Sequence, residues 1–157
     1  MNAQLPTVLH VEDDDNDRLL VKIACRNTKL PIRLTGVPDG EQAIAYLKGD
    51  AAYGDRDRYP FPSLILLDLK LPRKSGFEVL EWIRRQDQLR HLPVVIFSSS
   101  GLESDEKRAF KNGANSYSVK PIALDPLVEM VKQIHRRWLS ESAAVCEEQA
   151  ESAALVS

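Results

Sequence analysis

The chain has 157 residues, which suits one domain with a sizeable core and leaves little room for a second. Its 43% hydrophobic and 28% charged residues are typical of a soluble globular protein, and its net charge of −2 gives no bulk attraction to nucleic acid or to an anionic membrane. No stretch approaches the roughly 18 apolar residues of a membrane helix, and the N-terminal MNAQLP lacks a signal peptide's basic and apolar regions. We therefore expect a cytoplasmic protein without nucleic-acid or membrane partners.

The two cysteines, Cys25 and Cys146, are far apart and lack CxxC spacing. The sequence therefore predicts neither a disulfide framework nor a zinc site. Cys25 falls within a predicted helix, where we expect it to be a small apolar filler.

Short apolar runs alternate with longer amphipathic stretches along the chain. Residues 7–11 are predicted as a strand that ends in four consecutive acids, and residues 17–28 as a helix because apolar residues recur at helical spacing. The elements expected after these are, in chain order, a weak strand at 32–37, a helix at 41–47, a polar loop at 49–62, a strand at 63–67, a helix at 77–86, a strand at 93–97, a helix at 103–112, a strand at 116–119 and a helix at 124–139.

This order is (βα)5. Near-continuous apolar strands separated by helices predict a parallel sheet that is covered on both faces. Because helical crossovers are almost always right-handed, the expected fold class is α/β with a doubly wound sheet. We expect one domain over residues 1–140 and a C-terminal tail over 141–157 that is either a helical extension or disordered.

The carboxyl ends of the predicted strands carry the polar residues that suggest chemistry, since open doubly wound sheets place their sites at that edge. These residues are Glu12 and Asp13 after the first strand, Asp68 after the third, Ser98 after the fourth and Lys120 after the fifth. Crowded carboxylates repel one another, and Mg²⁺ with oxygen ligands would relieve that repulsion. A carboxylate can also attack a phosphoryl group to give an aspartyl phosphate. The set is therefore consistent with Mg²⁺-dependent phosphoryl transfer, which depends mainly on positioning and charge neutralisation.

Four sequence fragments, one at each of these strand ends, resemble the marks of two-component response regulator receiver domains. They are VEDD (11–14), LLDLKLP (66–72) with Gly76 after it, VIFSSS (95–100), and Tyr117 to Val119 followed by Lys120-Pro121. The resemblance covers about residues 5–139. It implies the flavodoxin-like form of the fold, with five parallel strands in the order 2-1-3-4-5.

The resemblance also implies a role for each site residue. Asp68 would be the phosphoacceptor, and Mg²⁺ would be held by Glu12, Asp13, Asp68 and the backbone carbonyl of Lys70. Ser98 would be the switch hydroxyl, Lys120 the lysine that contacts the phosphoryl group, and Tyr117 the switch aromatic. Lys70 and Ser100 would occupy the two positions that tune phosphate lifetime, and the Lys120–Pro121 peptide bond would be cis.

The partners follow from the same resemblance. The phosphodonor would be a sensor histidine kinase or a histidine phosphotransfer protein. The long loop at 49–62 and the Trp138-Leu139 pair resemble stand-alone regulators that partner bacterial phytochromes, so a bacteriophytochrome is the expected kinase. Because no output domain is expected after the last helix, we expect output through protein contacts. The apolar last helix suggests a homodimer through the face of the fourth helix, fifth strand and fifth helix.

Several residues also have simpler interpretations. Asp14, Asp15 and Asp17 are expected to be solvated acids favoured by the helix dipole, with Asp14 or Asp15 as the N-cap. Tyr117 could equally pack its ring at the sheet edge, and His10 is expected to be packed or hydrogen-bonded rather than a phosphodonor. Trp82 and Trp138 are most simply core or interface residues.

Rival functions are weaker. An EF-hand fails because Arg18 and Ala24 replace the turn glycine and the final glutamate, and no glycine-rich phosphate loop follows the first strand. A phosphatase that works through an aspartyl phosphate usually has a second aspartate where this chain has Lys70. A scaffold that never uses the pocket stays open. We expect a phosphoacceptor rather than a turnover enzyme.

Overall fold

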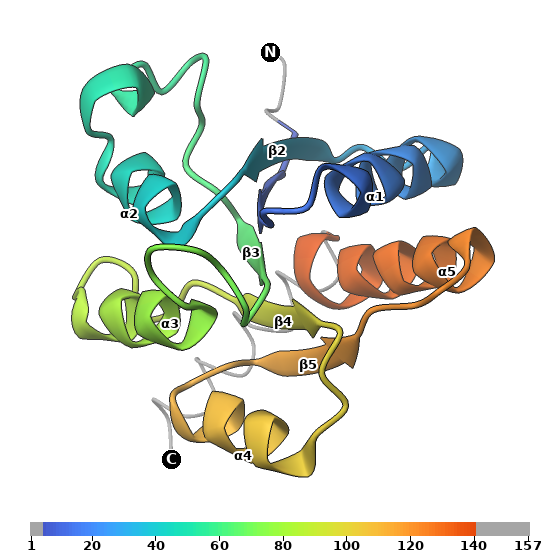
Figure 1. Ribbon diagram of the computed structural model, residues 1–157. Coiled ribbons are helices and arrows are strands. Elements are labelled where there is room, and N and C mark those ends of the chain that lie inside the picture. Colours follow the sequence, from blue (N-terminus) through green and yellow to red (C-terminus); the bar gives the residue numbers. More distant parts are fainter. Residues whose placement is uncertain (1–4, 141–157) are drawn as a thin grey trace, which may run out of the picture.

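The computed structural model describes residues 5–140 and contains one five-stranded sheet surrounded by helices (Figure 1). The strands are β1 (Thr7–Val11), β2 (Arg33–Val37), β3 (Leu64–Leu67), β4 (Val94–Ser98) and β5 (Ser116–Val119). The helices are α1 (Asp15–Thr28), α2 (Gly40–Lys48), α3 (Gly76–Arg85), α4 (Glu103–Lys111) and α5 (Leu124–Ile134). The predicted tail at 141–157, with Cys146, lies outside the described residues.

All strand pairs are parallel and their order is β2-β1-β3-β4-β5, which confirms the predicted doubly wound, flavodoxin-like α/β fold. The chain runs from β1 to β2 on one side of the sheet, and the crossover after β2 then passes back over β1 to β3 on its other side. Such a switch point opens a crevice at the carboxyl ends of β1 and β3. The fold therefore places the ends of these two strands beside each other.

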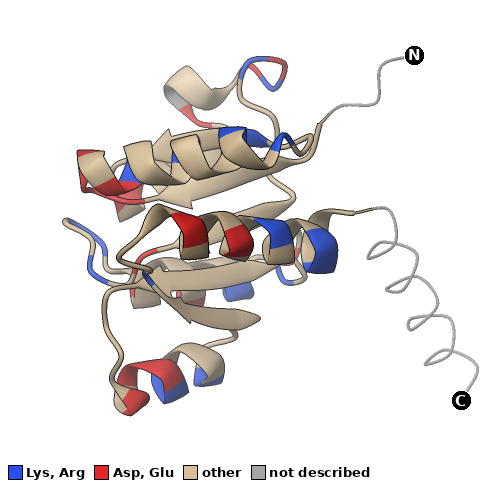
Figure 2. Cartoon of the chain, turned by 90° about the vertical axis from the view of Figure 1, so that its right-hand side faces the viewer, with Lys and Arg blue, Asp and Glu red and all other residues tan. Residues whose placement is uncertain are grey.

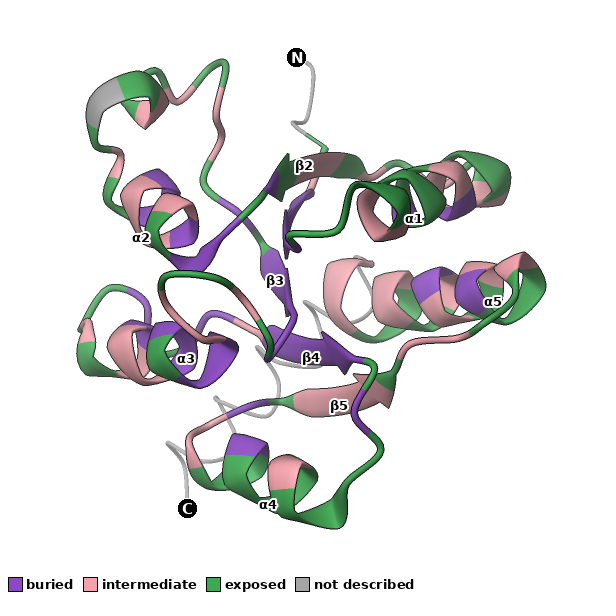
Figure 3. Ribbon diagram, in the orientation of Figure 1, coloured by how far each residue is buried: buried purple, intermediate pink, exposed green. Residues whose placement is uncertain are grey.

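Helices cover both faces of the sheet, with α1 and α5 on one side and α2, α3 and α4 on the other (Figure 1). The inner strands β1, β3 and β4 are buried along their whole length, whereas the edge strand β5 is half-exposed (Figure 3). The uninterrupted apolar runs LILL and VVIF fill both cores because their alternate residues face opposite sides. The strands that end at the crevice are thus the most firmly packed parts of the fold.

Two helix boundaries differ from the prediction by more than one residue. α1 begins at Asp15 rather than at residue 17, because the Asp14 side chain accepts a hydrogen bond of 2.9 Å from the backbone N–H of Asp17 and caps the helix there. α5 ends at Ile134, and a π-helical turn (His135–Leu139) takes the place of the predicted last helical turn. Within residues 5–140, no helix is both long enough and apolar enough to cross a bilayer.

The predicted loop at 49–62 is held by Arg56, although it contains only one short 3-10 turn (Ala51–Tyr53). The Arg56 guanidinium donates to the carbonyl oxygens of Tyr46 at 2.8 Å and Leu47 at 3.0 Å, the last turn of α2. The Tyr46 carbonyl also accepts the Gly49 N–H at 3.1 Å, and the arginine adds further donors at this end of the helix, where the last carbonyls lack intrahelical partners. The loop is consequently fastened to α2.

Candidate functional site

Three acids meet at the carboxyl ends of β1 and β3. Glu12 and Asp13 follow β1, Asp68 follows β3, and one carboxylate oxygen from each lies within 4.8 Å of those of the other two. Glu12 and Asp68 are buried, whereas Asp13 is exposed. Further acids in the first turn of α1 surround this edge of the sheet (Figure 2). The sequence prediction that these three acids converge is therefore matched by their placement.

Backbone hydrogen bonds beyond the strands fix two of these acids. The N–H of Glu12 donates to the Val37 carbonyl at 3.0 Å, and the N–H of Asp68 donates to the Val11 carbonyl at 3.1 Å. Gly76 opens α3 directly behind Asp68, where an added Cβ would lie 2.1 Å from the Asp68 carbonyl oxygen. Only glycine fits at that distance, and the close approach holds the turn after β3 against α3.

Lys120 reaches into the acid cluster from the end of β5. Its backbone N–H donates to the Ser98 carbonyl at 2.8 Å, which continues the β4–β5 ladder by one residue. Its Nζ donates to Asp68 Oδ2 at 2.9 Å and to Asp17 Oδ2 at 2.8 Å, and it also hydrogen-bonds Glu12 Oε1. The side chain is only 14% exposed, so the ammonium is largely removed from water.

The electrostatics of the cluster follow from burial and from this ammonium. Burial alone would lower the pKa of Lys120, but its hydrogen bonds to Asp17, Glu12 and Asp68 outweigh burial and raise that pKa above its usual range. Burial raises the pKa of Glu12 to about 8, although the lysine hydrogen bond opposes the shift. Asp17 is buried less, and its hydrogen bond from Lys120 keeps its pKa below the ordinary value. The carboxylates of the cluster therefore outnumber the Lys120 ammonium that they contact.

The donor set suits a hard divalent cation. Glu12 Oε2 is buried and has no hydrogen-bond partner among residues 5–140, so one carboxylate oxygen of the cluster lacks a ligand. An unpaired buried carboxylate oxygen is costly, and a cation would satisfy it. Asp68 Oδ1 accepts a 3.2 Å bond from the Lys70 N–H, which places the Lys70 backbone beside the acids. Oxygen ligands of this kind fit Mg²⁺ or Mn²⁺.

The predicted switch residues form a connected chain away from the acids. Ser98 is fully buried, and its Oγ accepts a 3.2 Å bond from the Ser100 N–H. The Tyr117 hydroxyl donates to the Ser100 carbonyl at 2.8 Å, and the Ser100 hydroxyl donates to Asp105 Oδ2 at 2.6 Å in the first turn of α4. The structure thus ties Tyr117 to Ser100, a link that the sequence did not predict.

Two expectations about this region are wrong. Asp17 was expected to be a solvated acid, but its carboxylate accepts a hydrogen bond from the Lys120 ammonium, because the first turn of α1 faces the end of β5. The Lys120–Pro121 bond was expected to be cis, but every described peptide bond is trans, and Lys120 reaches the acids in that geometry. Of the two predicted N-cap candidates, Asp14 and Asp15, the structure selects Asp14.

The simpler interpretations of the remaining residues hold. His10 is buried against the Phe97 ring, and burial lowers its pKa to about 4, so it is neutral and packed. Trp82 and Trp138 pack at the margins of the two cores, and Cys25 lies beside the second. None of these four side chains contributes to the acid cluster.

Comparison with known proteins agrees with this geometry. Residues 8–132, which include all three acids and Lys120, match the response regulator receiver domain. The chain belongs to this family.

Relatives of this receiver domain include regulators of light signalling. It is 36% identical to the response regulator Rcp1 of Synechocystis sp. over 84% of this chain and 88% of Rcp1. The phosphorylated cyanobacterial phytochrome response regulator RcpA is 37% identical, with a TM-score of 0.78 over 86% of this chain and 94% of RcpA. The response regulator RPA3017, in red light signaling of R. palustris, is 34% identical, with a TM-score of 0.82 over 87% and 95% of the two chains. Rcp1 has also been solved in a Mn²⁺-bound form, which has a TM-score of 0.75 to this chain.

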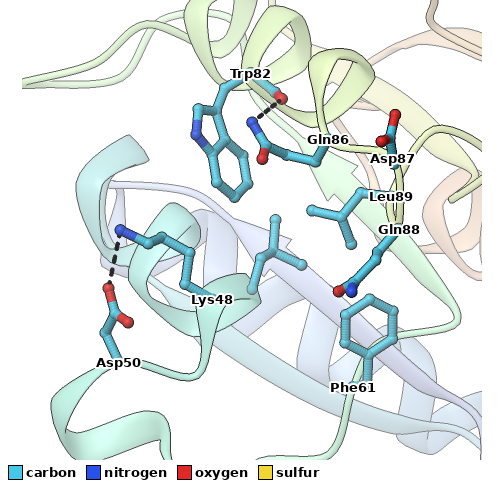
Figure 4. Close-up of a pocket in the computed structure, with 9 residues that line it drawn as sticks. Lys48, Asp50, Phe61, Trp82, Gln86, Asp87, Gln88 and Leu89 are labelled. Carbon is cyan, nitrogen blue, oxygen red and sulfur yellow. Dashed lines mark hydrogen bonds and ion pairs between the residues drawn. The ribbon is translucent and has the colours of Figure 1, made fainter.

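A second hollow of the receiver domain lies away from the acids. This pocket of about 660 Å³ is lined by the carboxyl ends of α2 and α3 and by the residues that follow them in the chain. Phe61 and Trp82 lie on opposite sides of it (Figure 4). Helices of a doubly wound sheet end at the amino edge of the strands, opposite the acids. The pocket therefore lies at the opposite edge of the sheet from the acid cluster.

Proposed function

We propose that the chain is a response regulator that accepts a phosphoryl group on Asp68 from a sensor histidine kinase. The observation that carries the proposal is the meeting of Asp68 Oδ2 with the Lys120 ammonium at 2.9 Å, beside the carboxylates of Glu12 and Asp13. A nucleophilic oxygen, a cation-binding set and a fixed positive charge are the components that phosphoryl transfer requires.

The proposed reaction is an in-line displacement. An Asp68 carboxylate oxygen forms a bond to phosphorus while the phosphorus–nitrogen bond of the donor phosphohistidine breaks, and the imidazole leaves with the electron pair of that bond. Mg²⁺, held by Glu12, Asp13, Asp68 and the Lys70 carbonyl, would neutralise the charge of the phosphoryl oxygens. Lys120 would contact one of these oxygens and Ser98 would donate its hydroxyl to another. A histidine phosphotransfer protein could supply the same phosphohistidine.

The added phosphoryl group would act through the chain of contacts beyond Ser98. If the Ser98 hydroxyl turns toward the phosphoryl group, the Ser100 N–H loses its acceptor, and Ser100 also contacts Tyr117 and Asp105. The phosphoryl group brings about −1.5 to −2 charges, enough to shift a population between two arrangements of this segment. We propose that Tyr117 and the start of α4 carry the change to partner proteins.

Two partners fit the proposal. The likeness to RcpA and RPA3017 supports a bacteriophytochrome as the histidine kinase, and the transfer would take place in the cytoplasm. A second copy of the chain is the proposed partner of the face formed by α4, β5 and α5. This face exposes the apolar side chains Leu102, Phe110, Val119 and Ile122. Sedimentation with and without beryllofluoride, a stable mimic of the phosphoryl group, would report whether this dimer depends on phosphorylation.

Incubation with Mg²⁺ and acetyl phosphate, followed by intact mass measurement, tests the acceptor. We expect uptake of one phosphoryl group by the wild type and none by Asp68→Asn. Asp125→Asn, in the first turn of α5, makes the same change of charge outside the cluster and should leave uptake intact. Phosphate uptake that survives Asp68→Asn would contradict the proposal. Transfer from a panel of purified histidine kinases would then identify the donor by the fastest rate.

A further inference from the structure

Asp17 stands apart from the other carboxylates that contact Lys120. Glu12 and Asp68 follow strands and belong to the cation-binding set, whereas Asp17 comes from the third position of α1 and does not belong to it. The Asp17 carboxylate nevertheless lies 2.8 Å from the lysine Nζ, about as close as the Asp68 carboxylate, which lies 2.9 Å from it. The lysine is therefore held from two sides, by the sheet and by a helix.

The fold fixes the position of Asp17. The Asp14 side chain caps α1 by accepting the Asp17 N–H at 2.9 Å, which holds the first turn of the helix in place. α1 packs against α5 along one face of the sheet, and Lys120 lies just before α5 begins (Figure 1). This packing brings the first turn of α1 to the end of β5. The Asp17 carboxylate is 35% exposed, so it also borders the mouth of the site.

A cation and the lysine would share the same two carboxylates, those of Glu12 and Asp68. Lys120 bonds one oxygen each of Glu12 and Asp68, and a cation bound to these acids draws on the electron density of both carboxylates. Phosphorylation then converts an Asp68 oxygen into part of an acyl phosphate. Asp17 is the one carboxylate contact of Lys120, among the described residues, that neither event uses.

We propose that Asp17 is a positioning residue, which keeps the Lys120 ammonium at the mouth of the site while the cation and the phosphoryl group occupy oxygens of Glu12 and Asp68. The inference rests on the proposed function, which it deepens. Asp17 makes no contact with the phosphoryl group in this scheme and acts only through the lysine. A lysine with four rotatable side-chain bonds loses considerable freedom when it is held, and a fixed partner supplies that restraint before the reaction begins.

A general helix-dipole role does not account for Asp17. Asp15 lies in the same first turn of α1, where an acid is favoured by the dipole. Its side chain is 90% exposed and pairs with Arg18 rather than with Lys120. Asp15→Asn therefore changes the charge of the same helical turn without removing the lysine contact, and it is the matched control.

The test compares Asp17→Asn and Asp15→Asn in the wild-type and Lys120→Gln backgrounds. Two quantities are measured at saturating Mg²⁺: the rate constant of phosphorylation by acetyl phosphate, from intact mass, and the affinity for beryllofluoride, from ¹⁹F NMR. We expect Asp17→Asn to lower both roughly tenfold, the equivalent of one hydrogen bond between charged groups. Asp15→Asn should change them by less than about twofold, and Asp17→Glu should recover part of the loss. Thermal denaturation of each variant confirms that it is folded.

The Lys120→Gln background separates positioning from a general effect. If Asp17 acts through the lysine, Asp17→Asn has almost no further effect once the lysine is gone, and the double-mutant cycle shows coupling. An equal loss in both backgrounds, or an equal loss from Asp15→Asn, overturns the inference and leaves the proposed function intact. A wild-type chain that neither takes up phosphate nor binds beryllofluoride overturns both.

Discussion

The ammonium nitrogen of Lys120 lies 2.9 Å from Oδ2 of Asp68, although 52 positions of the chain separate the two residues. Their strands, β5 and β3, are not neighbours, because β4 lies between them. The lysine therefore crosses the end of β4, where Ser98 stands, to reach the aspartate. This arrangement places a positive charge where negative charge would develop on a phosphoryl group.

Removal of that charge should slow phosphorylation. We expect Lys120→Gln to lower the rate with acetyl phosphate by about 10²-fold, a typical loss when one group that stabilises the transition-state charge is removed. The measurement is intact mass against time at saturating Mg²⁺. Lys132→Gln, which changes a partly exposed lysine of α5 paired with Glu129, should leave the rate at the wild-type value. A Lys120→Gln protein that reacts at the wild-type rate would show that the contact is only structural.

Glu12→Gln should weaken cation binding. One charge at about 4 Å is worth roughly 4 kcal/mol at an effective dielectric near 20, so we expect Mg²⁺ affinity to fall by about 10³-fold. Calorimetric titration of Mg²⁺ measures the change. Chelation of Mg²⁺ should likewise abolish phosphate uptake by the wild type. Glu41→Gln, an exposed acid of α2, is the control, and an equal loss in both variants would argue against a cation at Glu12.

Gly76→Ala should disturb both stability and the site. The new Cβ would lie 2.1 Å from the Asp68 carbonyl oxygen, so the backbone after β3 must move. We expect a loss of about 1–3 kcal/mol in the free energy of unfolding, together with slower phosphorylation. Urea denaturation and the acetyl phosphate assay measure the two effects. Gly101→Ala, where no atom lies within 4 Å of the added Cβ, should change neither quantity. Wild-type behaviour of Gly76→Ala would mean that the turn is softer than its contacts indicate.

His10 should make the folded state sensitive to acid. Burial first, and then the charge of Lys120, lower the pKa of His10 from 6.5 to about 4 in the folded chain. Folding therefore favours the neutral ring: this stabilisation is complete above about pH 6.5 and is lost as the pH falls toward 4. The loss amounts to about 2 kcal/mol by about pH 5. Urea unfolding of wild type and His10→Leu across this range measures it. Since both proteins retain Glu12, the difference between them isolates the histidine, and parallel pH profiles would refute the assignment.

Much of this molecule was predictable from the sequence because its signals are local. The runs LILL and VVIF identified two inner strands with Asp68 and Ser98 directly after them, and the strand at residues 7–11 identified the acids Glu12 and Asp13 that follow it. The contact of Asp17 with Lys120 was not predictable, because it depends on how α1 packs against α5 and not on any pattern within α1. The tether from Tyr117 to the Ser100 carbonyl likewise depends on how β5 lies beside the segment after β4, and no sequence pattern marked the π-helical turn after Ile134.

The acids of the cluster and the Lys120 ammonium follow strands that differ in rigidity. The acids follow β1 and β3, which are enclosed on both sides by other strands and by helices, whereas the ammonium is carried by β5 at the rim, which has a strand neighbour on one side only. Rims of a sheet open at lower free energy than its centre. A protein that binds the edge strand β5 would therefore move the Lys120 ammonium toward or away from the acids while the acids stay in place. Such a partner would adjust the lifetime of the proposed phosphoryl group on Asp68.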